Sequence, residues 1–200
     1  MKSSVKILAA FSLGIAAGLL GFFPGILIEK DWSIYFLYAL IFFVGVGVGS
    51  NEKALKMLRK PDLRMLLIPL GVVAGTYAGI LVFYPFIPGV NLKEALAVGS
   101  GFGYYSLSSV LITRMSGELL GVAALISNIA REIFTLIFTP LIVKYCGKVA
   151  PIMSGGATAT DTTLPVITKF SGKEFALYAV FSGMILTLLV PILITLLFKL

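Results

Sequence analysis

Two acidic residues, Glu132 and Asp161, lie in stretches of the chain that are otherwise almost free of charge, and Arg131 directly precedes Glu132. A carboxylate at the centre of a membrane helix costs about 2.5 to 3.5 kcal/mol on insertion scales, so it is by default a functional group that faces an aqueous interior. Successive residues of a helix point about 100° apart, so Arg131 is poorly placed to pair with Glu132 and could at best serve Asp161 across an interface. The pair therefore predicts an intramembrane site that binds a cation or carries a proton.

Polar side chains near the two carboxylates extend this predicted site. Asn128 precedes Glu132 by one helical turn on the same face, and threonines flank Asp161. Hydroxyl groups can hydrogen-bond a carboxylate and coordinate a cation, so the ligand could be Na⁺, a proton or an organic ammonium. The residues predicted to bind substrate or proton are Asp161, Glu132, Asn128, Thr160, Thr162, Ser106 and Tyr105.

Two glycine-rich segments are expected to interrupt helices beside these residues. Leu92 to Thr113 reads GSGFGYYS at its centre, and Gly155 to Pro165 combines paired glycines with threonines and a proline. Glycine costs about 1 kcal/mol in a helix, and proline removes a backbone donor. Non-helical backbone survives at lipid depth only when it is buried in protein or lines a watery cavity, as in secondary transporters whose interrupted helices meet near the midplane. The residues expected to shape the site are Gly101, Gly103, Gly155, Gly156, Pro165 and Arg131.

The composition excludes several other chemistries. The chain has no histidine, which removes a histidine base, a histidine proton relay and the commonest metal ligand. Its one cysteine, Cys146, can form neither a disulfide framework nor a multi-cysteine metal site within one chain. The glycine clusters complete neither G-x-G-x-x-G nor a Walker A pattern, so an ATP-driven pump is not indicated. We expect no enzyme, no metal site and no cofactor, with a proton as the coupling ion.

The elements that must position these residues are membrane helices. Of the 200 residues, 58% are hydrophobic and 12% are charged, and this charged share is about half that of an ordinary soluble domain. A span needs roughly 20 apolar residues, so we expect one all-α integral membrane transport domain over residues 1–200. It would contain the two interrupted segments, read as re-entrant, and five continuous spans. The continuous spans are Ile7–Ile28, Ser33–Ser50, Met65–Phe86, Leu119–Val143 and Phe175–Phe198.

The basic residues are expected to orient the chain in the membrane. Asn51 to Arg64 holds a cluster of lysines and arginines, which is typical of a cytoplasmic loop. If both interrupted segments re-enter, most of the 16 basic residues lie inside, with the N-terminus cytoplasmic and the C-terminus outside. Full crossings would move Lys144 and Lys148 outside, so the charge bias favours re-entry. The net charge of +7 is thereby explained by topology and indicates no nucleic-acid partner.

Three motifs resemble those of the LysO-type lysine exporter family, and the similarity extends over nearly the whole chain. The motifs are Gly99–Ser108, Asn128–Glu132 and Gly155–Pro165, which agree with the family in spacing and order. The resemblance implies export of L-lysine through the prokaryotic cell membrane, with Glu132 and Asp161 as the intramembrane acidic pair. For such an exporter we predict that ionised Asp161 binds the substrate ammonium and that Glu132 or Asp161 carries the proton in antiport.

Longer members of the family resemble this chain in their C-terminal two-thirds and carry further spans at the N-terminus. The chain is therefore expected to pair with a second copy as a homodimer or with a separately encoded complementary half. Three aromatic residues, Phe102, Tyr104 and Tyr105, could cover the methylene stem of the substrate or meet its ammonium face-on. Packing against neighbouring helices is the alternative role for these rings.

Other functions would use the same residues. An Na⁺/H⁺ or other inorganic-cation exchanger would use both carboxylates with a smaller cavity, and a membrane partner subunit that is inactive alone would use them for assembly. A potassium-channel filter is a poorer match, because Gly99 and Ser100 replace the usual Thr-Val lead and a filter has no use for Glu132.

Overall fold

The computed structural model describes residues 63–87 and 89–199 and scattered positions between 13 and 50. Every helix named below belongs to the compact unit from Phe42 to Leu200. The predicted spans Ile7–Ile28 and Ser33–Ser50 and the basic segment Asn51 to Arg64 lie largely outside the described residues. Those two spans and the cytoplasmic assignment of that segment stay predictions.

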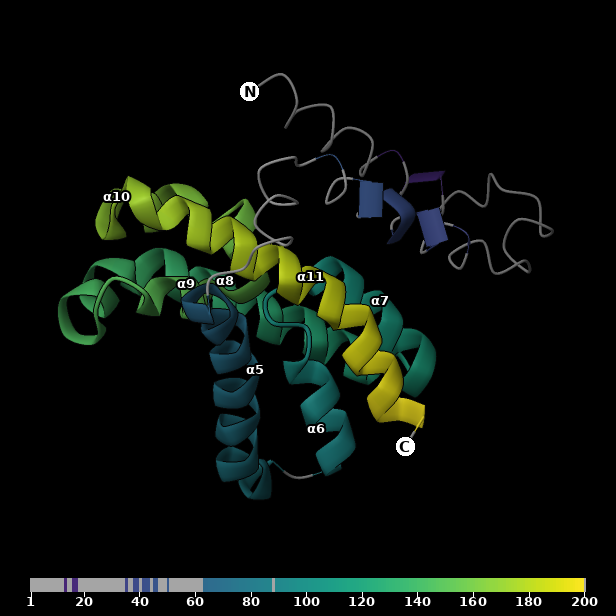
Figure 1. The fold of residues 1–200 in the computed structure, drawn as a ribbon. Helices are drawn as coiled ribbons and strands as arrows, with labels where there is room; N and C mark the ends of the chain where they lie inside the picture. The colour runs from purple at the N-terminus through teal and green to yellow at the C-terminus, as the bar shows by residue number, and fades with distance from the viewer. Residues whose placement is uncertain are drawn as a thin grey trace. The chain divides into compact units, whose positions relative to one another are not determined.

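Three long helices form the frame of the described fold (Figure 1). They are α5 (Leu63–Phe83), α8 (Glu118–Cys146) and α11 (Ala176–Lys199). Segments long and apolar enough to cross a membrane cover Met65–Phe86, Glu118–Cys146 and Lys173–Lys199. The continuous spans predicted at these three places are confirmed as helices of that kind, and no strand occurs in the part of the chain that the structure describes.

Each long helix contains a proline: Pro69 in α5, Pro140 in α8 and Pro191 in α11. Membrane helices tolerate proline because neighbouring helices and polar side chains satisfy the freed backbone group. The 29 residues of α8 make it about 43 Å long at about 1.5 Å per residue, which exceeds the roughly 30 Å of a hydrocarbon core. It is therefore long enough to connect the two faces of a bilayer.

The first interrupted segment consists of α6 (Leu92–Gly99), a break at residues 100–104, and α7 (Tyr105–Ser116). A capping box begins α6, because Asn91 Oδ1 accepts from the Glu94 N–H at 2.9 Å and Glu94 Oε2 accepts from the Asn91 N–H at 3.0 Å. The Ser116 hydroxyl donates to Glu94 Oε1 at 3.1 Å. The start of α6 therefore lies beside the end of α7, and the segment folds back on itself with the break at its tip.

The second interrupted segment has the same arrangement. It consists of α9 (Ala150–Gly155), the 3-10 helix η2 (Gly156–Thr160) and α10 (Leu164–Ser171), and it is followed by the short η3 (Lys173–Phe175). Lys148 precedes α9 and Glu174 follows α10, and Lys148 Nζ lies 3.8 Å from Glu174 Oε1. Such an exposed pair adds little stability, but it shows that the two ends of the segment lie side by side. Both helix interruptions predicted from the glycine-rich sequences are confirmed.

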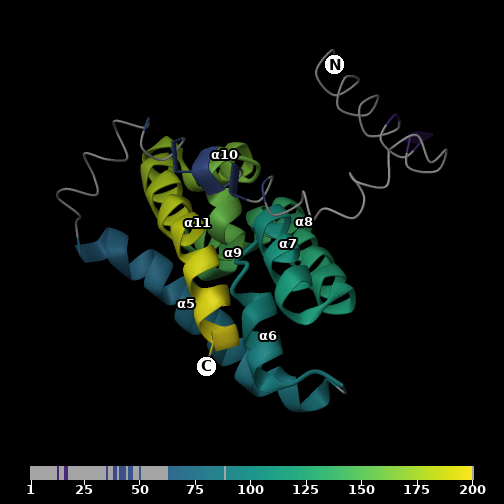
Figure 2. The same ribbon diagram turned by 90° about the vertical axis from the view of Figure 1, so that its right-hand side faces the viewer.

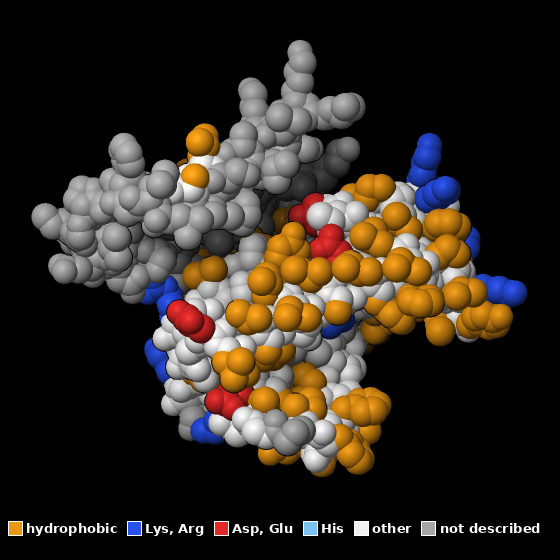
Figure 3. All heavy atoms as spheres, turned by 180° about the vertical axis from the view of Figure 1, so that it is seen from behind, with side chains coloured by type: hydrophobic (Ala, Val, Ile, Leu, Met, Phe, Trp, Pro, Cys, Tyr) orange, Lys and Arg blue, Asp and Glu red, His pale blue; other side chains and the backbone are white. Residues whose placement is uncertain are grey.

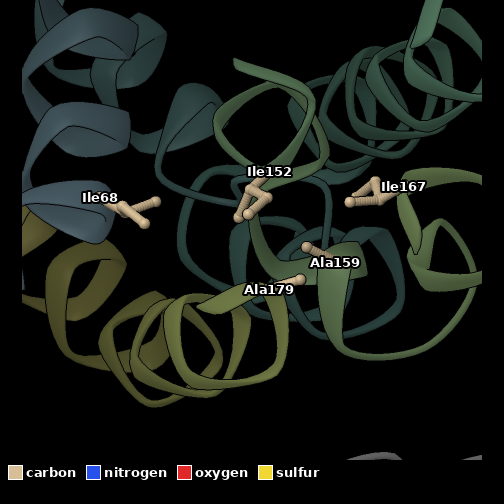
Figure 4. Close-up of a cluster of buried hydrophobic side chains, with 5 residues drawn as sticks. All are labelled: Ile68, Ile152, Ala159, Ile167 and Ala179. Atoms are coloured by element: carbon tan, nitrogen blue, oxygen red, sulfur yellow. The ribbon is translucent and has the colours of Figure 1, made fainter. Parts of the chain in front are cut away.

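A cluster of buried apolar side chains joins the second interrupted segment to two long helices (Figure 4). It contains Ile68 of α5, Ala179 of α11, and Ile152, Ala159 and Ile167 from α9, η2 and α10. The small alanine side chains let η2 and α11 approach closely, as small residues do where membrane helices pack. The turned view shows α9 between α8 and α11, and both of these helices contact it (Figure 2).

Large apolar side chains cover much of the outside of this unit (Figure 3). On α8 the exposed residues Leu119, Val122, Ile126, Ile133 and Ile137 recur at spacings that place them on one helix face. Most lysine and arginine side chains in this view lie toward its edges, with the apolar band between them. An apolar band of this kind is the surface that lipid requires.

Candidate functional site

A cavity of about 570 Å³ lies where the two helix breaks meet. Its walls come from the start of α7, from α8, from η2 with the residues after it, and from α11. The lining residues are Gly103, Tyr104, Tyr105, Ser106, Glu132, Ala157, Thr158, Thr160, Asp161, Thr162, Val180, Met184 and Thr187. The cavity therefore combines two carboxylates with several hydroxyl groups and a small apolar wall.

The two breaks touch through their backbones. The Ala157 N–H donates to the Phe102 carbonyl at 2.9 Å. Phe102 has φ 45°, a left-handed conformation that costs roughly 1 to 2 kcal/mol for a residue with a side chain. Gly156 has φ +62°, and a Cβ at this position would collide with the same Phe102 carbonyl. The contact therefore requires glycine at position 156 and keeps Phe102 in a strained conformation.

Asn128 of α8 holds the first break from the side. Its side chain is 3% exposed, its Oδ1 accepts from the Gly103 N–H at 2.7 Å, and its Nδ2 donates to the Ala124 carbonyl at 2.8 Å. Longer contacts run from Nδ2 to Ser108 Oγ at 3.3 Å and to the Val98 carbonyl at 3.4 Å. The Asn128 amide, which the sequence predicts to bind substrate, is therefore engaged by protein groups and does not itself line the cavity.

Arg131, three residues further along α8, holds the second segment. Its Nε donates to the Ser154 carbonyl at 2.9 Å and its Nη2 to the Met153 carbonyl at 3.1 Å. Its Nη1 donates to Thr76 Oγ1 of α5 at 3.1 Å. The two carbonyls belong to the last residues of α9, where the helix dipole favours a cation. Within the described residues no ion pair joins Arg131 to Glu132 or Asp161, so this guanidinium joins α8 to α5 and α9.

The two carboxylates reach the cavity from different elements. Glu132 comes from α8 and is partly exposed. Asp161 follows η2 and is exposed, and its Oδ1 accepts a hydrogen bond from the Thr162 N–H at 2.6 Å. No ion pair to a described lysine or arginine involves either carboxylate. Both groups are therefore available to a cation that enters the cavity.

Hydroxyl groups supply most of the remaining polar atoms. Thr160 Oγ1 donates to the Ala157 carbonyl at 3.0 Å, and Thr158 Oγ1 donates to the Gly155 carbonyl at 2.8 Å. A hydroxyl that donates its one hydrogen still has lone pairs that accept. These threonines can therefore accept a hydrogen bond from an ammonium group while they hold the backbone of η2.

The cavity brings together most of the residues that the sequence singles out. From the predicted binding set it is lined by Asp161, Glu132, Thr160, Thr162, Ser106 and Tyr105, and from the predicted shaping set by Gly103. Asn128, Arg131, Gly101, Gly155, Gly156 and Pro165 lie outside the lining. A Cβ on Gly101 would collide with the Asn128 amide, and one on Gly155 would come 2.7 Å from Thr163 Oγ1. Pro165 lies in the first turn of α10.

The aromatic residues divide between two roles. Tyr104 and Tyr105 line the cavity, where they can contact a ligand. Phe102 is 0% exposed, and its ring centroid lies 6.3 Å from that of Tyr77. Phe102 therefore packs against α5 and does not line the cavity. Of the two roles that the sequence leaves open for this ring, substrate contact and packing against a helix, Phe102 has the second.

Helix α11 contributes lining residues that sequence reasoning missed, namely Val180, Met184 and Thr187. Its apolar sequence is nearly uniform around the helix, so no pattern marks the face that meets the cavity. Gly183 is the residue of α11 that comes closest to marking this face in the sequence. A Cβ at this position would come 2.8 Å from the Ala157 carbonyl. This small residue lets α11 lie against η2.

Comparisons with known proteins give the relatives of this chain. The protein named Lysine exporter LysO from Escherichia coli is 34% identical over 191 residues, which are 96% of this chain and 62% of the relative. The protein named Putative lysine exporter from Haemophilus influenzae is 36% identical in an alignment 199 residues long, which covers 94% of this chain and 95% of the relative. The chain thus spans less than two-thirds of the first relative and nearly all of the second. No solved structure matches the chain at a significant level.

The family comparison covers almost the whole sequence. The family model described as Lysine exporter LysO matches residues 8–198, which include both interrupted segments, α8 and the acidic pair. The resemblance stated from the three motifs is confirmed. The chain belongs to the Lysine exporter LysO family.

Proposed function

We propose that this chain is a secondary transporter that exports L-lysine, or a close cationic amino acid, in exchange for protons. The observation that carries the proposal is the cavity lined by Glu132 and Asp161 at the meeting of two helix breaks. The family and the names of both relatives support lysine as the substrate. The proposed location is a prokaryotic inner membrane, which the chain crosses several times.

In this proposal the interrupted segments are re-entrant hairpins that enter from opposite sides of the membrane. The Glu94–Ser116 contact closes the base of the first hairpin, and the Lys148–Glu174 pair closes the base of the second. Helix α8 runs from one base to the other, so each base lies on its own side. Asn128 and Arg131, which hold the two tips, stand about 15 to 20 Å from the start of α8, near the middle of a bilayer. Interrupted helices that meet at this depth surround the substrate in many secondary transporters.

The orientation follows from the lysines at the base of the second hairpin. Lys144, Lys148, Lys169 and Lys173 lie on the segments that enter or leave this base, and all four are exposed. Cytoplasmic loops carry such an excess of positive charge. We therefore assign this base and the N-terminus to the cytoplasm, with the C-terminal end of α11 outside.

Export of lysine requires coupling, because lysine carries one net positive charge. Moving this charge out of an inside-negative cell costs about 2.3 kcal/mol per 100 mV. Exchange for one entering proton moves no net charge and leaves the pH and lysine gradients as drivers. Ionised Asp161 binds the ammonium, and a proton from outside that binds Glu132 or Asp161 displaces the lysine and is later released into the cytoplasm.

Reconstitution of the purified full chain into vesicles tests this proposal. Vesicles loaded with labelled L-lysine are expected to lose it faster when the outer medium is acidified, whether or not Na⁺ is present. The double replacement of Glu132→Gln and Asp161→Asn should reduce the loss to that of protein-free vesicles. The control is Lys169→Met, an exposed residue of α10, which should leave the rate within about twofold.

Each contrary outcome identifies a different error. Lysine loss retained by the double variant contradicts the role of the acidic pair. Flux that follows an Na⁺ gradient and ignores lysine makes the chain an inorganic-cation exchanger. Flux that appears only when a second polypeptide is supplied makes the chain a subunit that is inactive alone, whereas flux from the purified chain by itself supports a homodimer as the working transporter.

A further inference from the structure

We propose that this cavity recognises its ligand as a dication, so that an α,ω-diamine binds it at least as well as the amino acid does. The inference rests on the proposed function and names the ligand class of the same site. It follows from the charges that line the cavity and from the direction in which Arg131 points.

The charged side chains among the described residues that line the cavity are all acidic. Glu132 and Asp161 are both acidic, and none of the described lining residues is a lysine or an arginine. Arg131 is the cation next to Glu132 on α8, but its three nitrogens donate to the Ser154 and Met153 carbonyls and to Thr76. The cavity therefore offers no described cation to pair with a carboxylate of the ligand.

Two ammonium groups match the two carboxylates. Glu132 and Asp161 line the same cavity and reach it from different elements, so a ligand with an ammonium at each end of a flexible chain can engage one carboxylate with each end. Its methylene chain can then lie against Val180 and Met184. A hydrogen bond between charged partners strengthens binding by about tenfold or more. Each ammonium of the ligand should therefore contribute a step of that size.

The carboxylate of an amino acid has weaker partners in the same cavity. It meets neutral donors such as the hydroxyl groups of Ser106 and Thr162, and it is repelled by both acidic side chains. Removing this carboxylate removes the repulsion and leaves both ammonium contacts in place. The amino-acid carboxylate is therefore tolerated by the site and contributes little to affinity.

Isothermal titration calorimetry on the full chain in detergent tests the inference with four ligands. Lysine is compared with cadaverine, which lacks its carboxylate, norleucine, which lacks its side-chain ammonium, and aminocaproate, which lacks its α-ammonium. We expect cadaverine to bind as tightly as lysine or more tightly, and the two other analogues to bind at least about tenfold more weakly. Asp161→Asn and Glu132→Gln should each weaken cadaverine binding by about tenfold or more.

The four wild-type titrations decide the matter even if the variants do not fold. If lysine binds but cadaverine binds no more tightly than norleucine, the dication inference is overturned and the proposed function still stands. Cadaverine binding without lysine binding supports the dication site and removes lysine as the substrate. Absence of binding by all four ligands overturns both proposals.

Discussion

At the scale of single residues, Arg131 joins three helices through one side chain. It donates from α8 to Thr76 on α5 and to the Met153 and Ser154 carbonyls at the end of α9. A guanidinium presents its donors in a rigid planar fork, which the ammonium of lysine cannot reproduce. The role assigned to Arg131 therefore depends on its shape as well as on its charge.

Replacement of Arg131 should destabilise the fold. Arg131→Met removes all three hydrogen bonds and leaves carbonyl oxygens of α9 without donors, so the free energy of unfolding should fall by about 3 kcal/mol or more. Arg131→Lys should also destabilise, by a smaller amount. Chemical denaturation in mild detergent measures both changes, and Lys169→Met, an exposed lysine, should shift stability by at most about 0.5 kcal/mol. Wild-type stability of Arg131→Lys would show that charge alone suffices.

At the scale of elements, each helix break supports the other. The Phe102 carbonyl of the first break accepts from the Ala157 N–H of the second, and Asn128 and Arg131 fix the two breaks to the same helix. The cavity with both carboxylates lies at this junction. Separation of the breaks should therefore disturb the site even when every cavity side chain is kept.

The replacement of Gly156 by alanine tests this dependence. The new Cβ would collide with the Phe102 carbonyl, and alanine would have to adopt φ +62° at a cost of about 1 to 2 kcal/mol. We expect lysine efflux to fall by at least about tenfold. The matched control is Gly79→Ala on α5, where nothing lies within 4 Å of the new Cβ and the better helix former should preserve or slightly raise stability. Unchanged efflux from Gly156→Ala would mean that the contact between the breaks is dispensable.

The helices and their breaks could be predicted from the sequence wherever amino-acid composition alone determines them. Three glycines within the five residues Gly99–Gly103 make a poor helix, and long apolar runs form membrane helices, so the breaks and α5, α8 and α11 follow from the sequence. The partners of Asn128 and Arg131 do not follow, because they include backbone carbonyls that every residue carries. The cavity face of α11 does not follow either, since Val180 and Met184 look like any other apolar residues of that helix.

At the scale of the whole molecule, the proposed topology places the two hairpin bases on opposite sides of the membrane. Lys93 and Glu118 mark the first base, and Lys148 and Lys173 mark the second, and all four are exposed. If the interrupted segments crossed fully instead, Lys93 and Glu118 would face opposite compartments. The side on which these residues lie therefore distinguishes re-entry from crossing.

Labelling of single cysteines by a membrane-impermeant thiol reagent shows on which side of the membrane each residue lies. Exposed Cys146 is first replaced by serine, and a cysteine is then placed at each of the four positions in turn. We expect Lys93→Cys and Glu118→Cys to label in intact cells, and Lys148→Cys and Lys173→Cys to label only after permeabilisation. Labelling of positions 93 and 118 from different compartments would contradict the re-entrant arrangement, and the Cys146→Ser parent measures background.

The bonds of Arg131 also bear on how the protein is made. Residues 153 and 154, whose carbonyls receive its hydrogen bonds, are synthesised after α8 is complete. Before these residues are synthesised, the Arg131 guanidinium of a newly inserted α8 has not yet formed its hydrogen bonds to the second hairpin. Placing such an arginine in lipid costs about 2.5 to 3.5 kcal/mol on insertion scales. A newly inserted α8 is therefore stabilised by staying beside the earlier helices until the hairpin that follows has been translated.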